Sequence, residues 1–363
     1  MSKRILMAMS GGIDSSVAAI LLRKQQYEVI GATYRTYDQI SQECISREKG
    51  CCTVDAIFEA QQMAHNLGME HHIIDLREEF ASTVIANFID EYMCGRTPNP
   101  CVVCNATIKW GKMMEWADRL GCDAIATGHY ARIGVTDEGR YYLRRGADTA
   151  KDQTYFLWRL SQDNLHRTHF PLGDYVKPEV RQMALDAGFE RLSKKTESQE
   201  ICFVPDNDYR HFLYDNVPDF DTRCKMGNFI DKNGNVLGQH TGCPNYTIGQ
   251  RKGLGVAFGS PRYVTQINAT ANTVTLGLRD DLLSSKCRLK SVNMMKYADF
   301  TDGTTIMAKL RYRSNPVPAD IYHCPEGIEL RFPSPAESVT PGQSAVLYTG
   351  PDYNDVLAGG IIC

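Results

Sequence analysis

The sequence predicts an α/β protein in which a doubly wound parallel sheet is followed by a small central domain and a C-terminal β-barrel. Strand-like apolar stretches alternate with segments of helical periodicity in residues 1–204, as in an open parallel sheet with helices on both faces. Short segments broken by Gly, Asn and Pro follow in residues 205–282, and alternating apolar stretches with frequent turn residues fill residues 283–363. Because 363 residues exceed what one compact core accommodates, three domains with these bounds are expected.

The strands and helices are assigned from the spacing of apolar residues. Residues 4–9 and 29–34 are apolar and β-prone, and residues 15–24 between them carry apolar side chains at helical spacing, which predicts a βαβ unit. Further helices are expected at 53–67, 78–92 and 108–120, strands at 72–76 and 123–127, a hairpin turn at Asn233-Gly234, and barrel strands at 305–311 and 327–331.

Composition narrows the classes of function. The formal net charge of -3 argues against a uniformly electropositive surface, so any contact with nucleic acid must come from local basic patches. The 13 cysteines are odd in number and irregularly spaced, which favours metal, redox or sulfur chemistry over a disulfide framework. The sequence contains no run with the length of a membrane span and no signal-peptide pattern at its start, so a cytoplasmic protein without a membrane partner is expected.

A glycine-containing turn between the first strand and the first helix has the composition of a phosphate-binding loop. In Ser10-Gly11-Gly12-Ile13-Asp14-Ser15, two glycines allow a tight turn, two serines supply hydroxyl donors, and the following helix directs N–H groups at an anion. No Gly-Lys-Ser/Thr follows, so this is not a Walker sequence. The alternative is an ordinary strand-to-helix turn with an aspartate near the helix N-cap. The flanking strand and helix favour the ligand-binding interpretation.

Three of the predicted strands end in residues suited to a ligand site. Parallel sheets bind ligands outside the carboxyl ends of their strands, so the tips at Ser10, at Tyr34 and at Thr127-Gly128-His129 are expected to converge. Tyr34 is placed to flank an adenine, and Gly128 permits close approach of a nucleotide. His129 alone is equally consistent with a polar residue that is satisfied at a strand end.

Two cysteines stand in contexts that suit reactive thiols. A proline-punctuated loop at 97–105 leads into the helix expected from residue 108, so Cys104 lies near a helix N-terminus, where the dipole favours the thiolate. Cys202 lies far along the chain, between polar residues 197–200 and an apolar stretch. These two are the candidate reactive thiols.

Six sequence blocks together resemble the tRNA-specific 2-thiouridylases, a family of the ATP pyrophosphatases. The blocks are Ser-Gly-Gly-x-Asp-Ser from residue 10, Gly-Arg-Thr-Pro-Asn-Pro-x-x-x-Cys-Asn from 95, Ala-Thr-Gly-His-Tyr-Ala-Arg from 126, Lys-Asp-Gln-Thr-Tyr-Phe from 151, Ser-Gln-x-Ile-Cys-Phe from 198 and Tyr-Thr-Ile-Gly-Gln-Arg-Lys-Gly-Leu-Gly from 246. They stand in family order, and the resemblance extends to a Pro-Gly-Gln turn at 341–343. It implies a pyrophosphatase-type nucleotide domain, a small central domain and a C-terminal β-barrel.

The resemblance also implies a reaction. With ATP and Mg²⁺, the C2 oxygen of the wobble uridine of tRNA is adenylated and then replaced by sulfur, which gives 2-thiouridine. Cys202 would carry a persulfide received from a sulfur-relay or cysteine desulfurase donor, Cys104 would act as the nucleophile that frees the sulfur, and Asp14 would help to organise magnesium and phosphates. The acceptors implied are the tRNAs for Lys, Glu and Gln.

Family contact positions map onto numbered residues of this chain. The nucleotide-binding positions are Ala8, Met9, Ser10, Gly11, Gly12, Ile13, Asp14, Ser15, Tyr34 and Gly128. Asn99, Pro100 and Cys101 match positions that face the target base, and His129, Lys151, Asp152, Gln153, Arg311, Tyr312 and Gln343 match positions that touch tRNA. Adjacent cations in 249–253 and 309–313 suit phosphate contacts, although such runs are usually solvated surface. The wobble base is expected to flip out of its stack.

One departure from the family pattern leaves the sulfur route open. Many members have aspartate where this chain has Cys101, so Cys101, Cys104 and Cys202 could serve as ligands of a 4Fe-4S cluster with one open iron. That iron would deliver hydrosulfide to the base without a persulfide. The alternatives are a structural zinc site, although zinc normally takes four ligands, and a redox disulfide between Cys104 and Cys202. Cys44, Cys51 and Cys52 are interpreted as structural or incidental, with a labile metal as the alternative.

Two other functions fit part of the sequence. An amide-forming synthetase of the ATP pyrophosphatase type would use the same loop at 10–15 but would not require both Cys104 and Cys202. A non-catalytic RNA-binding or iron-sulfur carrier protein would not require an intact loop. ATP-dependent sulfur incorporation into unmodified tRNA distinguishes these functions.

Overall fold

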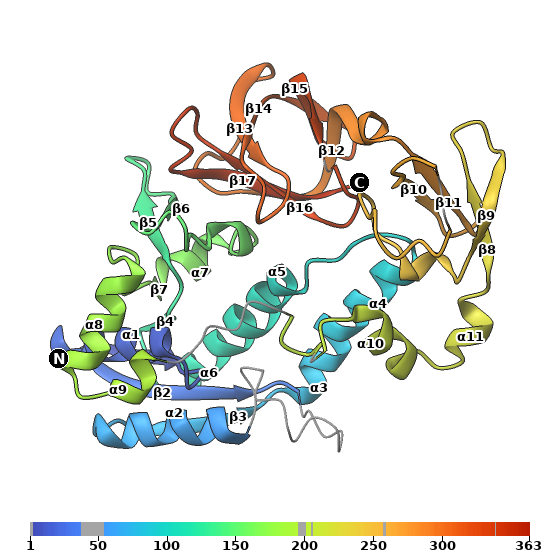
Figure 1. Cartoon of the computed structure of the whole chain (residues 1–363). Helices are drawn as coiled ribbons and strands as arrows, with labels where there is room; N and C mark the ends of the chain where they lie inside the picture. Colours follow the sequence, from blue (N-terminus) through green and yellow to red (C-terminus); the bar gives the residue numbers. More distant parts are fainter. Residues whose placement is uncertain (1–2, 38–53, 195–200, 205, 257–258, 338) are drawn as a thin grey trace.

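The chain forms an N-terminal α/β layer, a small central sheet and a closed C-terminal barrel (Figure 1). The computed structural model describes residues 3–37, 54–194, 201–204, 206–256, 259–337 and 339–363. This architecture confirms the predicted fold class. Within the described residues, no helix combines the length and apolarity needed to cross a membrane.

Five parallel strands form the first sheet, in the order β3-β2-β1-β4-β7. Their bounds are β1 Arg4–Ala8, β2 Glu28–Arg35, β3 His71–Asp75, β4 Ala124–Ala126 and β7 Thr168–His169. The first four confirm the predicted strands, whereas β7 is too short to give a period-2 signal. Because β1 lies between β2 and β4, the carboxyl ends of these three strands open on one edge of the sheet.

Helices cover both faces of this sheet because successive side chains of β1 point in opposite directions. Ile5 and Met7 enter one core, and Leu6 enters the other, where it joins the fully buried Trp110. The first core is shared with α1 Ile13–Lys24, α2 Val54–Asn66 and α8 Lys177–Asp186. The indole N–H of Trp110 donates to Thr168 Oγ1 at 2.8 Å, so its burial leaves no polar group unsatisfied.

The helix predicted at 108–120 begins at Pro100, which corrects the expectation of a loop at 97–105. Asn99 caps it, since its Oδ1 accepts from the Val102 N–H at 3.4 Å, and Pro100 occupies the first turn, where a missing N–H costs nothing. The helix comprises α5 Pro100–Cys104, the π-helical η3 Asn105–Lys112 and α6 Met113–Arg119. The helix predicted at 78–92 is α3 Arg77–Phe80, η2 Ala81–Ile85 and α4 Ala86–Met93.

The later half of the chain is built of antiparallel hairpins, apart from a parallel β8–β11 pair in the central sheet. The predicted hairpin turn at Asn233-Gly234 joins β8 Gly227–Ile230 to β9 Val236–His240, and Gly234 adopts a φ of +86°. The central sheet also contains β10 Tyr263–Asn268 and β11 Thr273–Gly277. The closed barrel has the order β12-β15-β14-β13-β16-β17, with bounds β12 Leu283–Met294, β13 Thr304–Lys309, β14 Val317–Cys324, β15 Gly327–Glu337, β16 Ser344–Tyr348 and β17 Val356–Ile362.

A hairpin that the sequence analysis did not assign connects the first domain to the barrel. It consists of β5 Ala131–Val135 and β6 Tyr141–Arg145, and the Arg144 guanidinium contacts the Asp355 carboxylate at 3.1 Å. The remaining short elements are η4 Thr154–Phe156, α7 Gln162–His166, α9 Glu190–Ser193, α10 Tyr209–Asn216, α11 Phe220–Arg223, η5 Cys243–Asn245 and η6 Arg279–Leu282.

Candidate active site

The loop between β1 and α1 is shaped by two glycines, as its sequence predicts. Gly11 has a φ of +67°, and a Cβ at this position would overlap the backbone carbonyl of Ala56 at the start of α2. Gly12 is the N-cap of α1. The loop therefore turns in a space that excludes any larger side chain and leads directly into a helix N-terminus.

Serine hydroxyls fix the loop internally. Ser15 Oγ donates to the Gly12 carbonyl at 3.1 Å and accepts from the Ser10 backbone N–H at 3.2 Å. Ser16 Oγ donates to the same carbonyl at 3.0 Å. Ser15 and Ser16 are buried, whereas Ser10 is exposed. Of the two serines predicted to face a phosphate, Ser10 presents its side chain to solvent and Ser15 supports the turn.

Asp14 is held by two residues that the sequence analysis did not single out. Lys177 Nζ lies 2.8 Å and 2.9 Å from the two carboxylate oxygens, and the Tyr130 hydroxyl donates to Oδ1 at 2.7 Å. The Lys177 side chain is only 8% exposed. Lys177 lies 163 residues from Asp14 in the sequence, so no local pattern relates them.

The tip of β4 packs closely against the nucleotide loop. A Cβ on Gly128 would lie 2.8 Å from the Ser15 N atom. Glycine is therefore required here because the backbone of α1 comes close, whereas close approach of a nucleotide stays a prediction. His129 follows, with Nδ1 2.8 Å from Thr127 Oγ1 and its ring against Trp110 and Phe170. Burial lowers the pKa of the His129 imidazole well below its usual value, and the nearby Lys109 cation lowers it further.

The neutral state of His129 predicts an acid-sensitive fold. The unfolded chain binds a proton near pH 6.5 and the folded chain does so only at lower pH, so stability falls on acidification. We expect His129→Asn to reduce this loss, which is at most about 1.4 kcal/mol per pH unit for one group. Urea midpoints at pH 7.5 and pH 5.5 measure it, with His65→Asn on α2 as the exposed control. Equal losses in both variants would contradict the prediction.

Hydrogen bonds and electrostatics link the nucleotide loop to the first thiol. Thr33 Oγ1 donates to the Met9 carbonyl at 2.8 Å, which attaches the loop to the end of β2. The next residue, Tyr34, packs against the same hydrophobic core as Cys104. Burial raises the pKa of the Tyr34 phenol, and the Cys104 thiol raises it further. The proximity of the phosphate loop and a reactive thiol stays a prediction.

The helix that starts at Pro100 changes the setting of the two nearby thiols. Cys101 stands in its first turn, whereas Cys104 is the last residue of α5, beyond the turn where the dipole acts most strongly. Surrounding protein atoms raise the pKa of the Cys101 thiol and the Lys109 cation lowers it, although the residue keeps an exposed surface. The expectation that Cys104 lies at a helix N-terminus is thus corrected, because Asn99 and Pro100 start the helix earlier.

Cys202 lies in a short turn that packs against the same core as Cys104. Both are partly buried cysteines that pack against the cluster that Tyr34 also contacts. Phe203 is fully buried, with its ring 5.1 Å from that of Phe88, and anchors the turn. Both candidate reactive thiols thus pack against the same large hydrophobic core.

The described residues contain no group of three His, Cys, Asp or Glu side chains that could hold a metal ion. Cys101, Cys104 and Cys202 therefore do not form a site for a single metal ion. The 4Fe-4S alternative, in which each thiol would bind a different iron, stays a prediction. Cys44, Cys51 and Cys52 lie outside the described residues.

The barrel contributes a turn that holds the segment leading into α5. The Gln343 amide donates to the carbonyls of Thr97 and Pro98 at 3.0 Å and 2.9 Å, and the Thr97 N–H donates to the Pro341 carbonyl at 2.9 Å. A Cβ on Gly342 would lie 2.8 Å from the Thr97 carbonyl. Gln343, predicted to touch tRNA, thus connects the barrel to residues 97 and 98, which lead into the helix that carries Cys104.

The other barrel residues of the predicted site lie at the same junction. Arg311 donates to the Ile248 carbonyl of the central domain at 3.2 Å and to Thr340 Oγ1. The Tyr312 ring lies 4.4 Å from that of Phe156, whose carbonyl accepts from the Asn105 amide at 2.9 Å. Residues from all three parts of the chain therefore meet beside α5.

The 151–153 segment faces inward more than the sequence suggests. Asp152 is 4% exposed and accepts from Thr154 Oγ1 at 2.8 Å, and burial raises the pKa of its carboxyl group. Gln153 Oε1 accepts from the Tyr130 N–H at 2.9 Å. Lys151 is partly buried. Two of these three side chains therefore support the fold around Tyr130 and the barrel.

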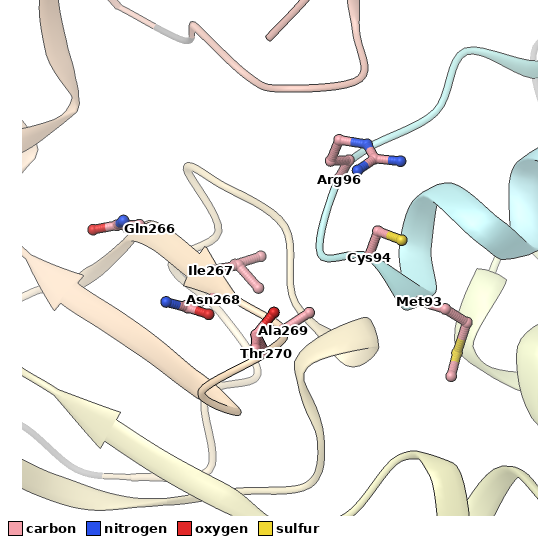
Figure 2. A pocket seen from close by; sticks show the side chains of 8 residues that line it. All are labelled: Met93, Cys94, Arg96, Gln266, Ile267, Asn268, Ala269 and Thr270. Carbon is pink, nitrogen blue, oxygen red and sulfur yellow. The ribbon is translucent and has the colours of Figure 1, made fainter.

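A pocket of about 540 Å³ opens between the end of α4 and strand β10 (Figure 2). Figure 2 shows Cys94 and Arg96 on one wall and Ile267 and Asn268 on the other. The complete lining is Met93, Cys94, Arg96, Gln266, Ile267, Asn268, Ala269 and Thr270. These residues lie outside the predicted site.

Comparisons with known proteins identify the family of the chain. The family models described as tRNA methyl transferase HUP domain, tRNA methyl transferase PRC-barrel domain and Aminomethyltransferase beta-barrel domain match residues 3–206, 212–278 and 284–362. The tRNA-specific 2-thiouridylase MnmA of Amoebophilus asiaticus is 47% identical over 361 residues, 99% of this chain and 95% of that protein. The chain belongs to the tRNA-specific 2-thiouridylase family. The MnmA protein of Salinibacter ruber is 44% identical over 99% of this chain and 94% of its own.

Membership of the 2-thiouridylase family confirms the resemblance found in the sequence. Two family models carry the description methyl transferase, but the relatives that match over nearly the full chain are named as thiouridylases. A crystal structure of a 4-thiouridine synthetase–RNA complex with bound ATP is also similar, at a TM-score of 0.39 and 17% identity over 61% of this chain and 52% of that one. A likeness at that level supports no inference about function.

Proposed function

We propose that this chain is a tRNA-uridine 2-sulfurtransferase, which adenylates the C2 oxygen of the wobble uridine with ATP and replaces it with sulfur. The single observation that supports this most directly is that Cys104 packs against the same hydrophobic core as Tyr34, which follows Thr33, the residue bonded to the Met9 carbonyl before the nucleotide loop. An activated oxygen held at that loop would lie near a sulfur donor. An ATP pyrophosphatase that forms amides does not require this proximity.

The proposed chemistry requires the nucleotide loop and the cysteines to act on the same uridine. The uridine C2 oxygen is a poor leaving group, and adenylation converts it into part of AMP, which departs with its electron pair when sulfur attacks C2. Pyrophosphate is the other product of ATP. The residues from Ala8 to Ser15, with Tyr34 and Gly128, surround the position proposed for ATP, where backbone N–H groups at the start of α1 face the phosphates. Magnesium offsets phosphate charge when bound, and the Asp14 carboxylate supplies a suitable oxygen ligand.

The sulfur is proposed to travel through a persulfide on Cys202. The Cys104 thiolate attacks the inner sulfur of that persulfide, a Cys104–Cys202 disulfide forms, and hydrosulfide departs to attack C2 of the adenylated uridine. A dithiol reductant then returns both cysteines to thiols. A sulfur-relay protein or a cysteine desulfurase supplies the persulfide sulfur.

The tRNA is proposed to bind across the junction of the three domains, which we place at residues 1–204, 205–282 and 283–363. Arg311 and Tyr312 join the barrel to the central domain and α5, and the exposed Arg251 and Lys252 lie on a nearby glycine-flanked turn. Asn99, Pro100 and Cys101 begin the helix that carries Cys104 and are proposed to face the flipped base. His129, the 151–153 segment and Gln343 complete the proposed tRNA surface. We propose a cytoplasmic reaction on the tRNAs for Lys, Glu and Gln.

Reconstitution with purified components tests this function. Unmodified tRNA with uridine at the wobble position is incubated with the chain, ATP, MgCl₂, a cysteine desulfurase, cysteine and dithiothreitol. We expect 2-thiouridine by mass spectrometry and one pyrophosphate per thiolated uridine. The same tRNA with cytidine at that position is the control. Absence of ATP-dependent thiolation, with the chain folded and the donor active, would overturn the proposal.

Exchanging Cys101 for aspartate separates the persulfide route from a cluster route. Because the proposed persulfide route uses only Cys104 and Cys202, we expect Cys101→Asp to keep thiolation within about threefold of wild type. The measurement is 2-thiouridine formation by protein purified without oxygen, alongside iron and acid-labile sulfide content. Loss of iron and of activity together in Cys101→Asp would favour the cluster.

A further inference from the structure

The nucleotide loop contains no lysine, yet a lysine from a distant helix is bonded to its aspartate. Lys177, the first residue of α8, places Nζ within 2.9 Å of both oxygens of Asp14, and its side chain is 8% exposed. The Tyr130 hydroxyl donates to the same carboxylate at 2.7 Å, and the ammonium lies 5.8 Å from the centre of the Tyr130 ring. Asp14 is therefore held on two sides by residues of the chain itself.

The same two residues are bonded to the 148–153 loop. The Lys177 backbone N–H donates to Asp148 Oδ2 at 2.9 Å, while Asp148 Oδ1 accepts from the Lys151 N–H at 3.2 Å. Gln153 is bonded twice to Tyr130, through its Oε1 at 2.9 Å and its backbone N–H at 3.0 Å. A displacement of this loop would therefore be transmitted to both donors that hold Asp14.

We propose that Lys177 and Tyr130 are positioning residues that couple tRNA binding at the 148–153 loop to nucleotide binding at Asp14. This rests on the proposed function, which gives the loop its RNA partner. An RNA that fixes the loop also fixes the Asp148 and Gln153 contacts, and through them the orientation of the carboxylate beside the phosphates. By thermodynamic reciprocity, each ligand then binds more tightly when the other is present.

A purely structural role for Lys177 makes a different prediction. A clamp between α1 and α8 would affect the stability of the fold but not the ratio of nucleotide affinities with and without RNA. Lys194 offers a matched control, because it forms a lysine–carboxylate pair with Glu190 at 2.7 Å on the adjacent α9, with a side chain 72% exposed. A comparison of substitutions at Lys177 and Lys194 separates the effect of losing a positive charge from the effect of losing the contact between α8 and Asp14.

The experiment is a binding measurement that requires no turnover. Calorimetric titration of the full chain with α,β-methylene-ATP in MgCl₂ is performed with and without an anticodon stem-loop RNA that carries uridine at the wobble position. We expect the RNA to tighten nucleotide binding by about fivefold or more in wild type, and by less than about twofold in Lys177→Met and Tyr130→Phe. Lys194→Met is expected to keep the wild-type ratio.

Each outcome decides the proposal. A wild-type ratio near one, or a wild-type ratio retained in Lys177→Met and Tyr130→Phe, would overturn it. If circular dichroism shows Lys177→Met to be unfolded, Tyr130→Phe decides, since it removes only one hydroxyl. The reconstituted reaction tests the proposed function, and the calorimetric titration tests the coupling. The two can fail independently, because the titration requires no thiolation of tRNA.

Discussion

Cys104→Ser is expected to lower 2-thiouridine formation at least about a thousandfold while pyrophosphate release from ATP continues. The substitution removes the only atom that the proposed route uses to attack the Cys202 persulfide, and a serine hydroxyl is not appreciably ionised at neutral pH. The substitution lies outside the nucleotide loop, whose internal hydrogen bonds come from Ser15 and Ser16. Thiolation and adenylation should therefore separate in this variant.

Three measurements check this separation. Mass spectrometry quantifies 2-thiouridine, a coupled assay follows pyrophosphate, and persulfide labelling reports whether sulfur accumulates on Cys202. Cys94→Ser is the matched control, because Cys94 is an exposed thiol on the α4 side of the pocket in Figure 2. Thiolation that persists in both Cys104→Ser and Cys202→Ser would remove the cysteines from the mechanism.

Gly11→Ala is expected to weaken ATP binding at least about a hundredfold, which corresponds to about 2.7 kcal/mol. Two causes act together: a φ of +67° disfavours any side chain, and the new Cβ would overlap the Ala56 carbonyl. The overlap is with backbone at the start of α2, so relief requires the loop itself to move. Movement of the loop displaces the backbone N–H groups proposed to face the phosphates.

Gly68→Ala separates the two causes. Gly68 has a φ of +61°, close to that of Gly11, but a Cβ there would meet no atom within 4 Å. We expect this control to lose about 1–2 kcal/mol of stability and to bind ATP like wild type. Nucleotide titration and thermal unfolding of both variants provide the comparison. If both variants bind ATP equally well, the role assigned to the Gly11 turn is wrong.

The sequence predicted those parts of the fold that local patterns determine. Alternation of apolar side chains located β1 and β2, and the two glycines after β1 located the nucleotide loop, because both features depend on neighbouring residues. The start of the helix at Pro100 was misplaced, although Asn99-Pro100 is a recognisable cap. The prolines around the cysteine motif indicate a loop, whereas the Asn99-Pro100 pair indicates the start of a helix.

Long-range partners were beyond the reach of local patterns. Lys177 and Tyr130 are 163 and 116 residues from Asp14, and nothing in their own segments distinguishes a lysine bound to the nucleotide loop from one in solvent. The inward orientation of Asp152 likewise depends on Thr154 and the barrel residue Tyr348. Family resemblance supplied the positions of several site residues but not the contacts that they make within the chain.

The bonds from Gln343 to the Thr97 and Pro98 carbonyls also bear on how the enzyme is made. A ribosome completes the residues before α5 long before it adds the barrel turn that secures them, so the newly made N-terminal part has its ATP loop while the approach to Cys104 still lacks this support. A polypeptide released early, before residue 343, would therefore be expected to bind ATP without a secured thiol. The proposed sulfur transfer would in this sense wait for synthesis of the barrel turn that contains Gln343.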